Sequence, residues 1–465
     1  MLISILPILQ LILRSYLVII FLSVSFSQYF IVPQRPIFDL LKWEEINSNK
    51  ILIPKVGPII NTDLEPSHFM FYYYPNMQTN RVLTGEIFSE VGVSSEQGPR
   101  LRLFGTAAIT MNDKLMIQNE FEFDNKGESN AHFQGIERGF KNGWVGYLQH
   151  SSLIYNYVNG HLSIGRGNPY YNNINESLLI NPHFPSVEYI WWQHENHWFQ
   201  FDWGFMMLSP IRDLNRFINF HRYGLNTQNY RIGFTEAVMG TYENWSVYET
   251  GYVLPAAIHF ETEENRGINA NLIWLIDGML KWRDYTFYGE ILIDDFALDK
   301  QSPPQLAGSI GLGRKLNQVL VNAEYTRINR WTGNYCRINL DSISTNVWIE
   351  TDIPIGHSIG SDAHQFMLSG YLQFNQKIAF QVSSILIESG NGMPVDRLYD
   401  WPDDVSCETN FGYNKEAFPT SSNINLYSKT NFYYLIRDWI MVDAQIALEK
   451  KKLPDYMVTL TFHID

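Results

Sequence analysis

Hydrophobic and polar side chains alternate along much of the chain from about Phe69 to its end. Between Phe199 and Phe205 every second residue is aromatic, and the residues between them are Gln, Asp and Gly. The same period of two recurs in residues 117–123, 321–326 and 378–383. Because successive side chains of a β-strand point to opposite faces, this pattern predicts many strands with one apolar and one polar face.

A soluble β-sandwich produces the same alternation, but three features favour a transmembrane barrel. The apolar faces are rich in aromatic residues, and glutamates such as Glu120 and Glu122 stand in mid-strand, as suits a wet lumen. The chain also ends on an alternating stretch from Tyr456 to Phe462. We therefore predict an all-β fold, a large antiparallel transmembrane β-barrel spanning residues 66–465.

The length of the chain sets the size of this barrel. A spanning strand takes about 9–11 residues, so the roughly 400 residues after the N-terminal part give about 16–18 strands. The stretches 168–185, 211–229, 299–305 and 390–421 have the composition of loops. No later stretch approaches the roughly 20 apolar residues of a membrane-spanning helix.

The N-terminus predicts export. Arg14 precedes an apolar run that ends in Ser25-Phe26-Ser27, so residues 1–27 resemble a signal peptide, with an uncleaved inner-membrane anchor as the alternative. Residues 28–65 contain an amphipathic stretch from Ile37 to Ile46, followed by prolines. We expect this segment to form a short helical part in the periplasm.

Composition narrows the possible partners. Only 18% of residues are charged and 15% are aromatic, and the formal net charge is −14. Nucleic acid is excluded as a partner because phosphate binding needs a basic face. Cys336 and Cys407 could pair in an oxidising periplasm or stay apart in different loops, and their spacing fits no metal site.

Several stretches together resemble the Wzi-type family of capsule-assembly outer-membrane barrels, in the same order along nearly the whole mature chain. These stretches are Val32-Pro33 with Ile37–Leu41, Gly165–Pro169 with Leu178–Asn181, Tyr288–Phe296, and Glu324–Arg327 with Pro354–Ala363. The resemblance implies an 18-stranded barrel with periplasmic helices in the bacterial outer membrane. It also implies a lectin-like role in holding capsular or other extracellular polysaccharide at the cell surface, without catalysis.

The residues most suited to binding carbohydrate combine aromatic rings with polar groups. Tyr and Trp rings stack on the apolar faces of sugars, and Arg forms paired hydrogen bonds with carboxylates of acidic glycans. The candidates are Arg166, Tyr170, Tyr171, Trp191, Trp192, Arg212 and Arg216. The aromatic residues could instead belong to interfacial girdles, and the arginines, with Arg222, could pair with strand glutamates in the lumen.

Catalytic and metal-binding patterns are weak. Asp294 and Asp295 are adjacent on an expected strand and should face opposite sides, and no G-x-S-x-G elbow occurs. The set His357, Asp362 and His364 offers possible ligands, but nothing fixes a third or fourth. We therefore expect no enzyme activity, no metal and no cofactor.

These observations lead to one main hypothesis and two alternatives. The main hypothesis is a non-enzymatic, monomeric lectin-like barrel whose partners are polysaccharide, outer-membrane lipid and lipopolysaccharide. The first alternative is a porin or substrate-specific channel, and the second is an outer-membrane hydrolase. An open lumen would distinguish the channel from the lectin.

Overall fold

The structure is a computed structural model that describes most of the chain between Leu83 and Ile464. The described residues are 83–94, 98–112, 114–125, 145–167, 176–180, 185–196, 198–211, 214–227, 229–242, 254–255, 259, 270–295, 305–316, 319–330, 332–333, 348–350, 353–375, 378–390, 423–437, 440–449 and 455–464. The predicted signal peptide, the segment 28–65 and both cysteines lie outside these residues.

Eighteen strands form one sheet. They are β1 (Leu83–Ser94), β2 (Gly98–Asn112), β3 (Leu115–Asp124), β4 (Val145–Tyr157), β5 (Gly160–Gly167), β6 (Val187–Glu195), β7 (Phe199–Ile211), β8 (Leu214–Asn226), β9 (Tyr230–Tyr242), β10 (Ala270–Trp282), β11 (Tyr285–Asp295), β12 (Gln305–Leu316), β13 (Val319–Ile328), β16 (Ala363–Asn375), β17 (Ile378–Ser389), β18 (Asn423–Arg437), β19 (Ile440–Glu449) and β20 (Asp455–Ile464). Two further strands of two residues each, β14 (Ile349–Glu350) and β15 (Ile353–Pro354), pair only with each other.

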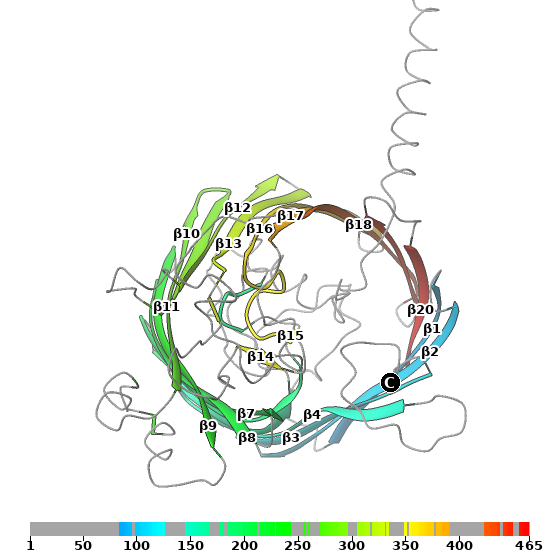
Figure 1. Cartoon of the computed structure of the whole chain (residues 1–465). Coiled ribbons are helices and arrows are strands. Elements are labelled where there is room, and N and C mark those ends of the chain that lie inside the picture. The colour runs from blue at the N-terminus through cyan, green and yellow to red at the C-terminus, as the bar shows by residue number, and fades with distance from the viewer. Residues whose placement is uncertain are drawn as a thin grey trace, which may run out of the picture.

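The sheet closes on itself. Each strand pairs antiparallel with the next along the chain, β13 pairs with β16, and β20 returns to β1 through pairs from Ile87↔Ile464 to Ser94↔Met457. Figure 1 shows the resulting ring of strands, seen down the barrel. Closure leaves no unpaired sheet edge, which is the condition for crossing a lipid bilayer with strands. The prediction of an all-β barrel is confirmed.

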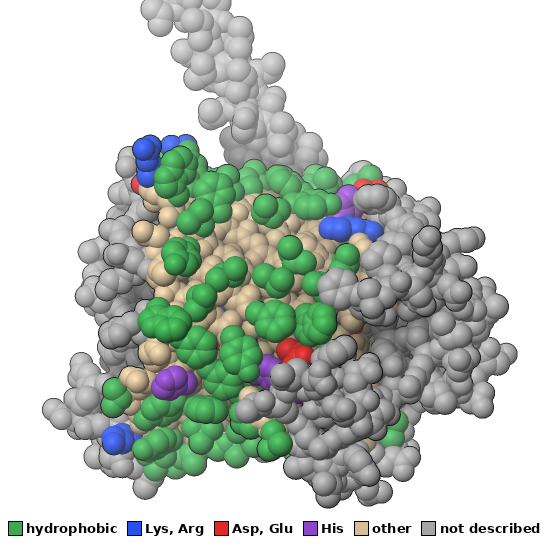
Figure 2. Space-filling model, turned by 90° about the vertical axis from the view of Figure 1, so that its left-hand side faces the viewer, with side chains coloured by type: hydrophobic (Ala, Val, Ile, Leu, Met, Phe, Trp, Pro, Cys, Tyr) green, Lys and Arg blue, Asp and Glu red, His purple; other side chains and the backbone are tan. Residues whose placement is uncertain are grey.

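The two faces of the wall have opposite character, and the polar face is the buried one. On β11 Glu290 is 2% exposed while its neighbour Ile291 is 55% exposed, and on β12 Ser309 is 6% and Ile310 67% exposed. Figure 2 shows one face of the outer wall, on which hydrophobic side chains are widespread while charged ones are sparse. A water-soluble protein rarely exposes so much apolar surface, so this wall is suited to lipid. No helix among the described residues is long and apolar enough to cross a membrane.

The strand connections differ in length at the two ends of the barrel. The connections 158–159, 227–229 and 283–284 are two or three residues long and join strands at one end, which we call the turn end. Residues 168–186, 243–269 and 329–362 join strands at the other end, which we call the loop end. In outer-membrane barrels the short turns lie in the periplasm and the long loops lie outside the cell, so we expect the loop end to face the exterior.

Two of these long connections return into the lumen, where they form what we call the plug (residues 176–180, 348–350 and 353–362). Leu178, Leu179, Ile180, Trp348 and Ile355 are almost fully buried in one apolar cluster. The rest of that cluster comes from the inner faces of β6 to β13 near the loop end. Figure 1 shows β14 and β15 inside the ring of strands, in agreement with these contacts.

The prediction of a loop at residues 211–229 is wrong. Residues 214–226 of the stretch 211–229 form β8, so Arg216 and Arg222 lie on a strand. The alternation is obscured there because both faces are mixed. The inner face carries Arg216 and Arg222 beside Ile218, and the outer face carries His221 beside Phe217.

Candidate functional site

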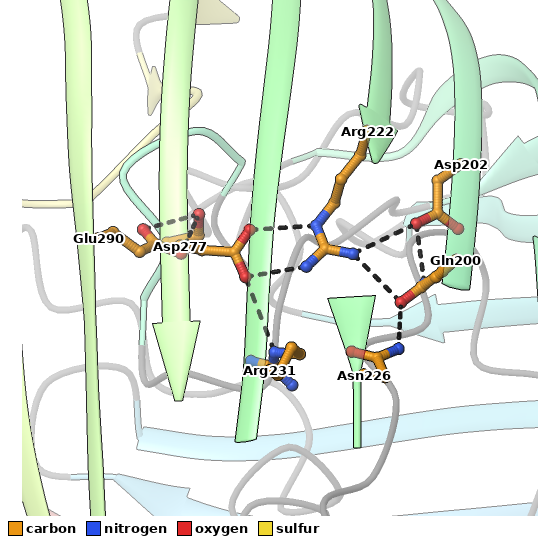
Figure 3. A network of polar contacts seen from close by, with 8 residues as sticks. Gln200, Asp202, Arg222, Asn226, Arg231, Asp277 and Glu290 are labelled. Atoms are coloured by element: carbon orange, nitrogen blue, oxygen red, sulfur yellow. Dashed lines mark hydrogen bonds and ion pairs between the residues drawn. The ribbon is translucent and has the colours of Figure 1, made fainter. Parts of the chain in front are cut away.

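A network of buried charges lies on the inner wall, centred on the guanidinium group of Arg222. Its Nε and Nη2 donate to the two carboxylate oxygens of Asp277 at 3.1 and 2.9 Å, and its Nη1 donates to Gln200 Oε1 at 3.1 Å. Asp202 Oδ2 lies 3.7 Å from Nη1, and Arg231 Nε lies 3.7 Å from Asp277 Oδ1. Figure 3 shows how these side chains converge from four strands.

Strand register explains why these residues meet. Asp202 is the direct cross-strand partner of Arg222, so both point into the lumen. Asp277 comes from β10, beyond β9, and is opposite Gly233. A Cβ at Gly233 would collide with the Arg222 guanidinium and with the Asp277 carboxylate. Only glycine therefore lets the arginine reach across β9 to its carboxylate partner.

All of these charges are removed from water. Arg222 and Asp202 are 0% exposed, Asp277 1% and Arg231 2%. Among the described residues two arginines face two aspartates, so the formal charges of these four side chains balance. Buried charges that satisfy one another in this way hold a structure in one arrangement, and they are poorly placed to bind a polymer from solution.

Carboxylates and backbone groups also attach the plug to the wall. Glu290 of β11 accepts hydrogen bonds from Ser177 Oγ at 3.1 Å and from the Leu178 backbone N–H at 2.7 Å. The two inserted segments are joined to each other where the Trp348 indole donates to the Leu179 carbonyl at 2.8 Å. These bonds fix the plug against the inner wall of the barrel.

A second carboxylate joins the two plug segments. Glu176 accepts from the Ser358 N–H at 2.9 Å and lies 3.4 Å from His357 Nδ1. A Cβ at Gly356 would collide with the Leu178 carbonyl, so the two backbones pack at a distance that only glycine permits. Each inserted segment is thereby held by both the wall and the other segment.

The structure separates the residues that the sequence grouped as carbohydrate ligands. Arg166 lies on the outer face at the loop end of β5, where it forms an ion pair with the exposed Glu188. Trp191 is 0% exposed and packs on Phe220 inside the barrel. Tyr170, Tyr171 and Arg212 lie outside the described residues.

The remaining two candidates also point away from any common surface. Trp192 is on the outer face, stacked edge-on against Phe201, and its indole donates to the Tyr157 hydroxyl at 2.8 Å. Arg216 is 1% exposed inside the barrel and donates to Met239 Sδ at 3.4 Å. Trp191 and Trp192 differ by a single position, which is enough to place them on opposite sides of the wall.

The weak metal and catalytic patterns are also dispersed. His357 contacts Glu176 inside the barrel, whereas His364 points outward from β16 and pairs with Glu388 at 2.7 Å. Asp362 has a positive φ of 58° and does not lie with either histidine in a group of potential metal ligands within the described part of the chain. Asp294 accepts a hydrogen bond from the Gly333 N–H at 2.6 Å.

One serine lies beside a histidine. His150 Nε2 is 2.7 Å from Ser152 Oγ on β4, and both residues are 3% exposed. Adjacent same-face positions of one strand bring them together. A nucleophile buried to this extent has no approach for a lipid or glycan substrate in the described structure.

Sequence reasoning gave Arg222 a possible place in a lumenal network with strand glutamates. The network exists, but the partners of Arg222 are Asp202, Asp277 and Gln200. That reasoning did not identify Gln200, Asp202, Arg231, Asp277 or Glu290. A usable signal was present, because each of these polar residues alternates with apolar neighbours of the outer face.

No protein-family model and no curated protein matches the sequence. Solved structures do match. Wzi of Escherichia coli, described as a carbohydrate binding β-barrel involved in group 1 capsule assembly, is 9% identical, with a TM-score of 0.54. The match covers 82% of this chain and 84% of that one.

Two proteins of Pseudomonas aeruginosa also match over 82% of this chain. OprD is 9% identical over 95% of its own chain, with a TM-score of 0.47, and OccK8 (OprE) is 7% identical over 98%, with a TM-score of 0.48. At these identities the likeness concerns the fold. Together with the closed sheet and the apolar outer wall, the likeness to Wzi shows that this chain is a bacterial outer-membrane β-barrel.

Proposed function

We propose that this barrel is a non-enzymatic outer-membrane protein that binds capsular or extracellular polysaccharide and holds it at the cell surface. The observation that carries the proposal is the plug. Two chain segments are packed in the lumen against the inner faces of β6 to β13, through apolar contacts and through hydrogen bonds to Glu290. A diffusion channel needs a continuous polar water path, and the plug occupies the part of the lumen beside β6 to β13.

The proposal also draws on the likeness to Wzi, whose TM-score of 0.54 accompanies the sequence resemblance described above. A plugged barrel exposes its loop end as the surface that meets the exterior. Arg166 lies at that end of β5, where the connection containing Tyr170 and Tyr171 begins. We keep these three residues and Arg212 as candidate ligands. We remove Trp191 and Arg216, which point into the barrel, and Trp192, which lies on the outer wall nearer the turn end than Arg166.

The test is binding of the purified, detergent-solubilised protein to extracellular polysaccharide from its own source cells. We expect saturable binding that Arg166→Ala or Tyr171→Ala weakens. Arg314→Ala is the matched control, because Arg314 is an exposed outer-face arginine near the turn end of β12, stacked 4.8 Å from the Tyr285 ring. It should bind like the wild type.

Conductance in planar bilayers separates this function from its alternative. A polysaccharide-holding barrel should insert without steady ion current. An intact barrel that conducts ions and does not bind the polysaccharide would refute the proposal and identify a porin or substrate-specific channel.

A further inference from the structure

A histidine and a glutamate stand on the outer face of the wall, where lipid-facing residues are expected. His221 of β8 and Glu236 of β9 are direct cross-strand partners. Two positions away on the same face, Tyr223 and Phe234 are 41% and 42% exposed. An ionisable pair on this face would be costly in contact with lipid, so its presence calls for a specific reason.

The pair is covered by a residue from the long connection between β9 and β10. His259 is 0% exposed, and His221 and Glu236 are each 2% exposed. The imidazole rings of His221 and His259 lie with centroids 4.5 Å apart. His259, which belongs to the connection that follows β9, therefore lies against the outer wall at this position.

The three side chains converge on a small volume. Glu236 Oε2 is 2.9 Å from His221 Nε2 and 3.9 Å from His259 Nδ1. One potential ligand atom from each residue can be chosen so that all three lie within 4.8 Å of one another. Ligands of tetrahedral zinc at about 2.0–2.1 Å from the metal are about 3.4 Å apart. Lengthening the 2.9 Å separation and shortening the 3.9 Å separation by about 0.5 Å each would bring these atoms to that spacing, with the fourth position open to water or another ligand.

Supporting hydrogen bonds hold the carboxylate in place. The Trp274 indole donates to Glu236 Oε1 at 3.3 Å, and the His259 backbone N–H donates to Oε2 at 2.8 Å. Orientation of a ligand by such donors is typical of metal sites.

We infer that His221, Glu236 and His259 form a binding site for a divalent transition-metal ion such as zinc. Imidazole nitrogen and carboxylate oxygen are suitable donors for such ions, and a divalent cation would offset the buried carboxylate charge. Because the ligands come from β8, β9 and the connection that follows β9, the ion would fix that connection to the outer wall. The site is separate from the lumen and from the proposed polysaccharide surface.

The test is zinc binding by the folded, detergent-solubilised protein after chelator treatment. Zinc content per chain is measured by mass spectrometry, and affinity by competition with a chromophoric chelator. We expect a single zinc ion per chain, and a loss of affinity of roughly 100-fold in His259→Ala and in Glu236→Gln, because each variant removes a direct ligand and even a lost supporting hydrogen bond costs about 10–100-fold.

The matched control is His364→Ala. His364 also forms an outward-facing cross-strand pair with a glutamate, Glu388, at 2.7 Å, but no third potential ligand joins that pair among the described residues. This variant should keep its zinc. His259 lies outside the strands, so His259→Ala should preserve the barrel, which heat-dependent migration in a detergent gel reports.

Two results would overturn the inference. One is a folded wild-type protein that retains no zinc. The other is zinc binding that survives in both His259→Ala and Glu236→Gln. In the supporting case zinc should also slow proteolytic cleavage between β9 and β10 in the wild type, and should leave the cleavage rate of His259→Ala unchanged.

Discussion

Replacement of Arg222 by methionine should destabilise the barrel more than any single change on its outer wall. The methionine side chain extends as far as the Nε position of arginine, so the change removes the charged guanidinium group while leaving much of the packing of the aliphatic stem. It removes both hydrogen bonds to Asp277 and the bond to Gln200. Asp277 then keeps Arg231 at 3.7 Å, and Asp202 keeps the Gln200 amide at 2.8 Å.

The expected loss of free energy of unfolding in Arg222→Met follows from the burial of the charges. Removal of one member of a buried ion pair leaves an uncompensated charge and costs about 3–5 kcal/mol. Both aspartates keep one contact in the variant, so we expect the free energy of unfolding to fall by an amount near the lower end of this range, about 3 kcal/mol. If Asp277→Asn is added, the isolated charge disappears, so the double variant should lose less than the sum of the two single losses by about 1 kcal/mol or more.

The assay is denaturant unfolding in lipid vesicles, followed by tryptophan fluorescence and gel mobility. Arg314→Met serves as the control, because Arg314 is exposed and its loss should change stability by less than about 0.5 kcal/mol. The reasoning is refuted if Arg222→Met costs no more than this control, or if the two single losses at Arg222 and Asp277 are simply additive.

Three further changes test the plug and its surroundings. Glu290→Ala removes the acceptor for the plug backbone, so bilayer recordings should show ion current that the wild type lacks, and a silent variant would contradict the anchoring role. Gly356→Ala should lower the melting temperature because its Cβ collides with the Leu178 carbonyl, whereas Gly370→Ala, whose Cβ would have its nearest neighbour at 3.9 Å, should not. Burial raises the pKa of Asp362, so its stabilising contribution is complete below the ordinary value of 3.8 and falls as pH rises through the raised pKa. Asp362→Asn, which also tolerates the positive φ, should therefore melt higher than the wild type at pH 8, with the difference shrinking towards pH 4.

The sequence was informative about each strand and much less so about contacts between strands. The alternation in residues 199–205 correctly predicted a strand with an aromatic outer face, and the estimate of 16–18 strands contains the observed 18. Alternation also fixes that Trp191 and Trp192 face opposite sides. It does not say which side is the lumen, because Trp is acceptable both in a packed interior and at a lipid interface.

The error at residues 211–229 has the same origin. β8 carries polar and apolar residues on both faces, since Arg222 enters the buried network and His221 faces His259 outside. A search for strands with one apolar and one polar face misses a strand that carries buried polar residues on both faces. The tertiary contacts that explain these residues come from β7, β10 and a connection 38 residues further along the chain.

The sequence by itself determined that this protein is built of many alternating strands with an aromatic, weakly charged outer face, and hence that it forms a membrane barrel. That information is local, because the side-chain period of a strand is a property of its own backbone. Closure of the ring, the plug, the ion-pair network and the cluster around Glu236 were decided only by the tertiary structure. They depend on register and on distant encounters, such as Ser177 with Glu290 across 113 residues, and no local pattern encodes which distant side chains will meet.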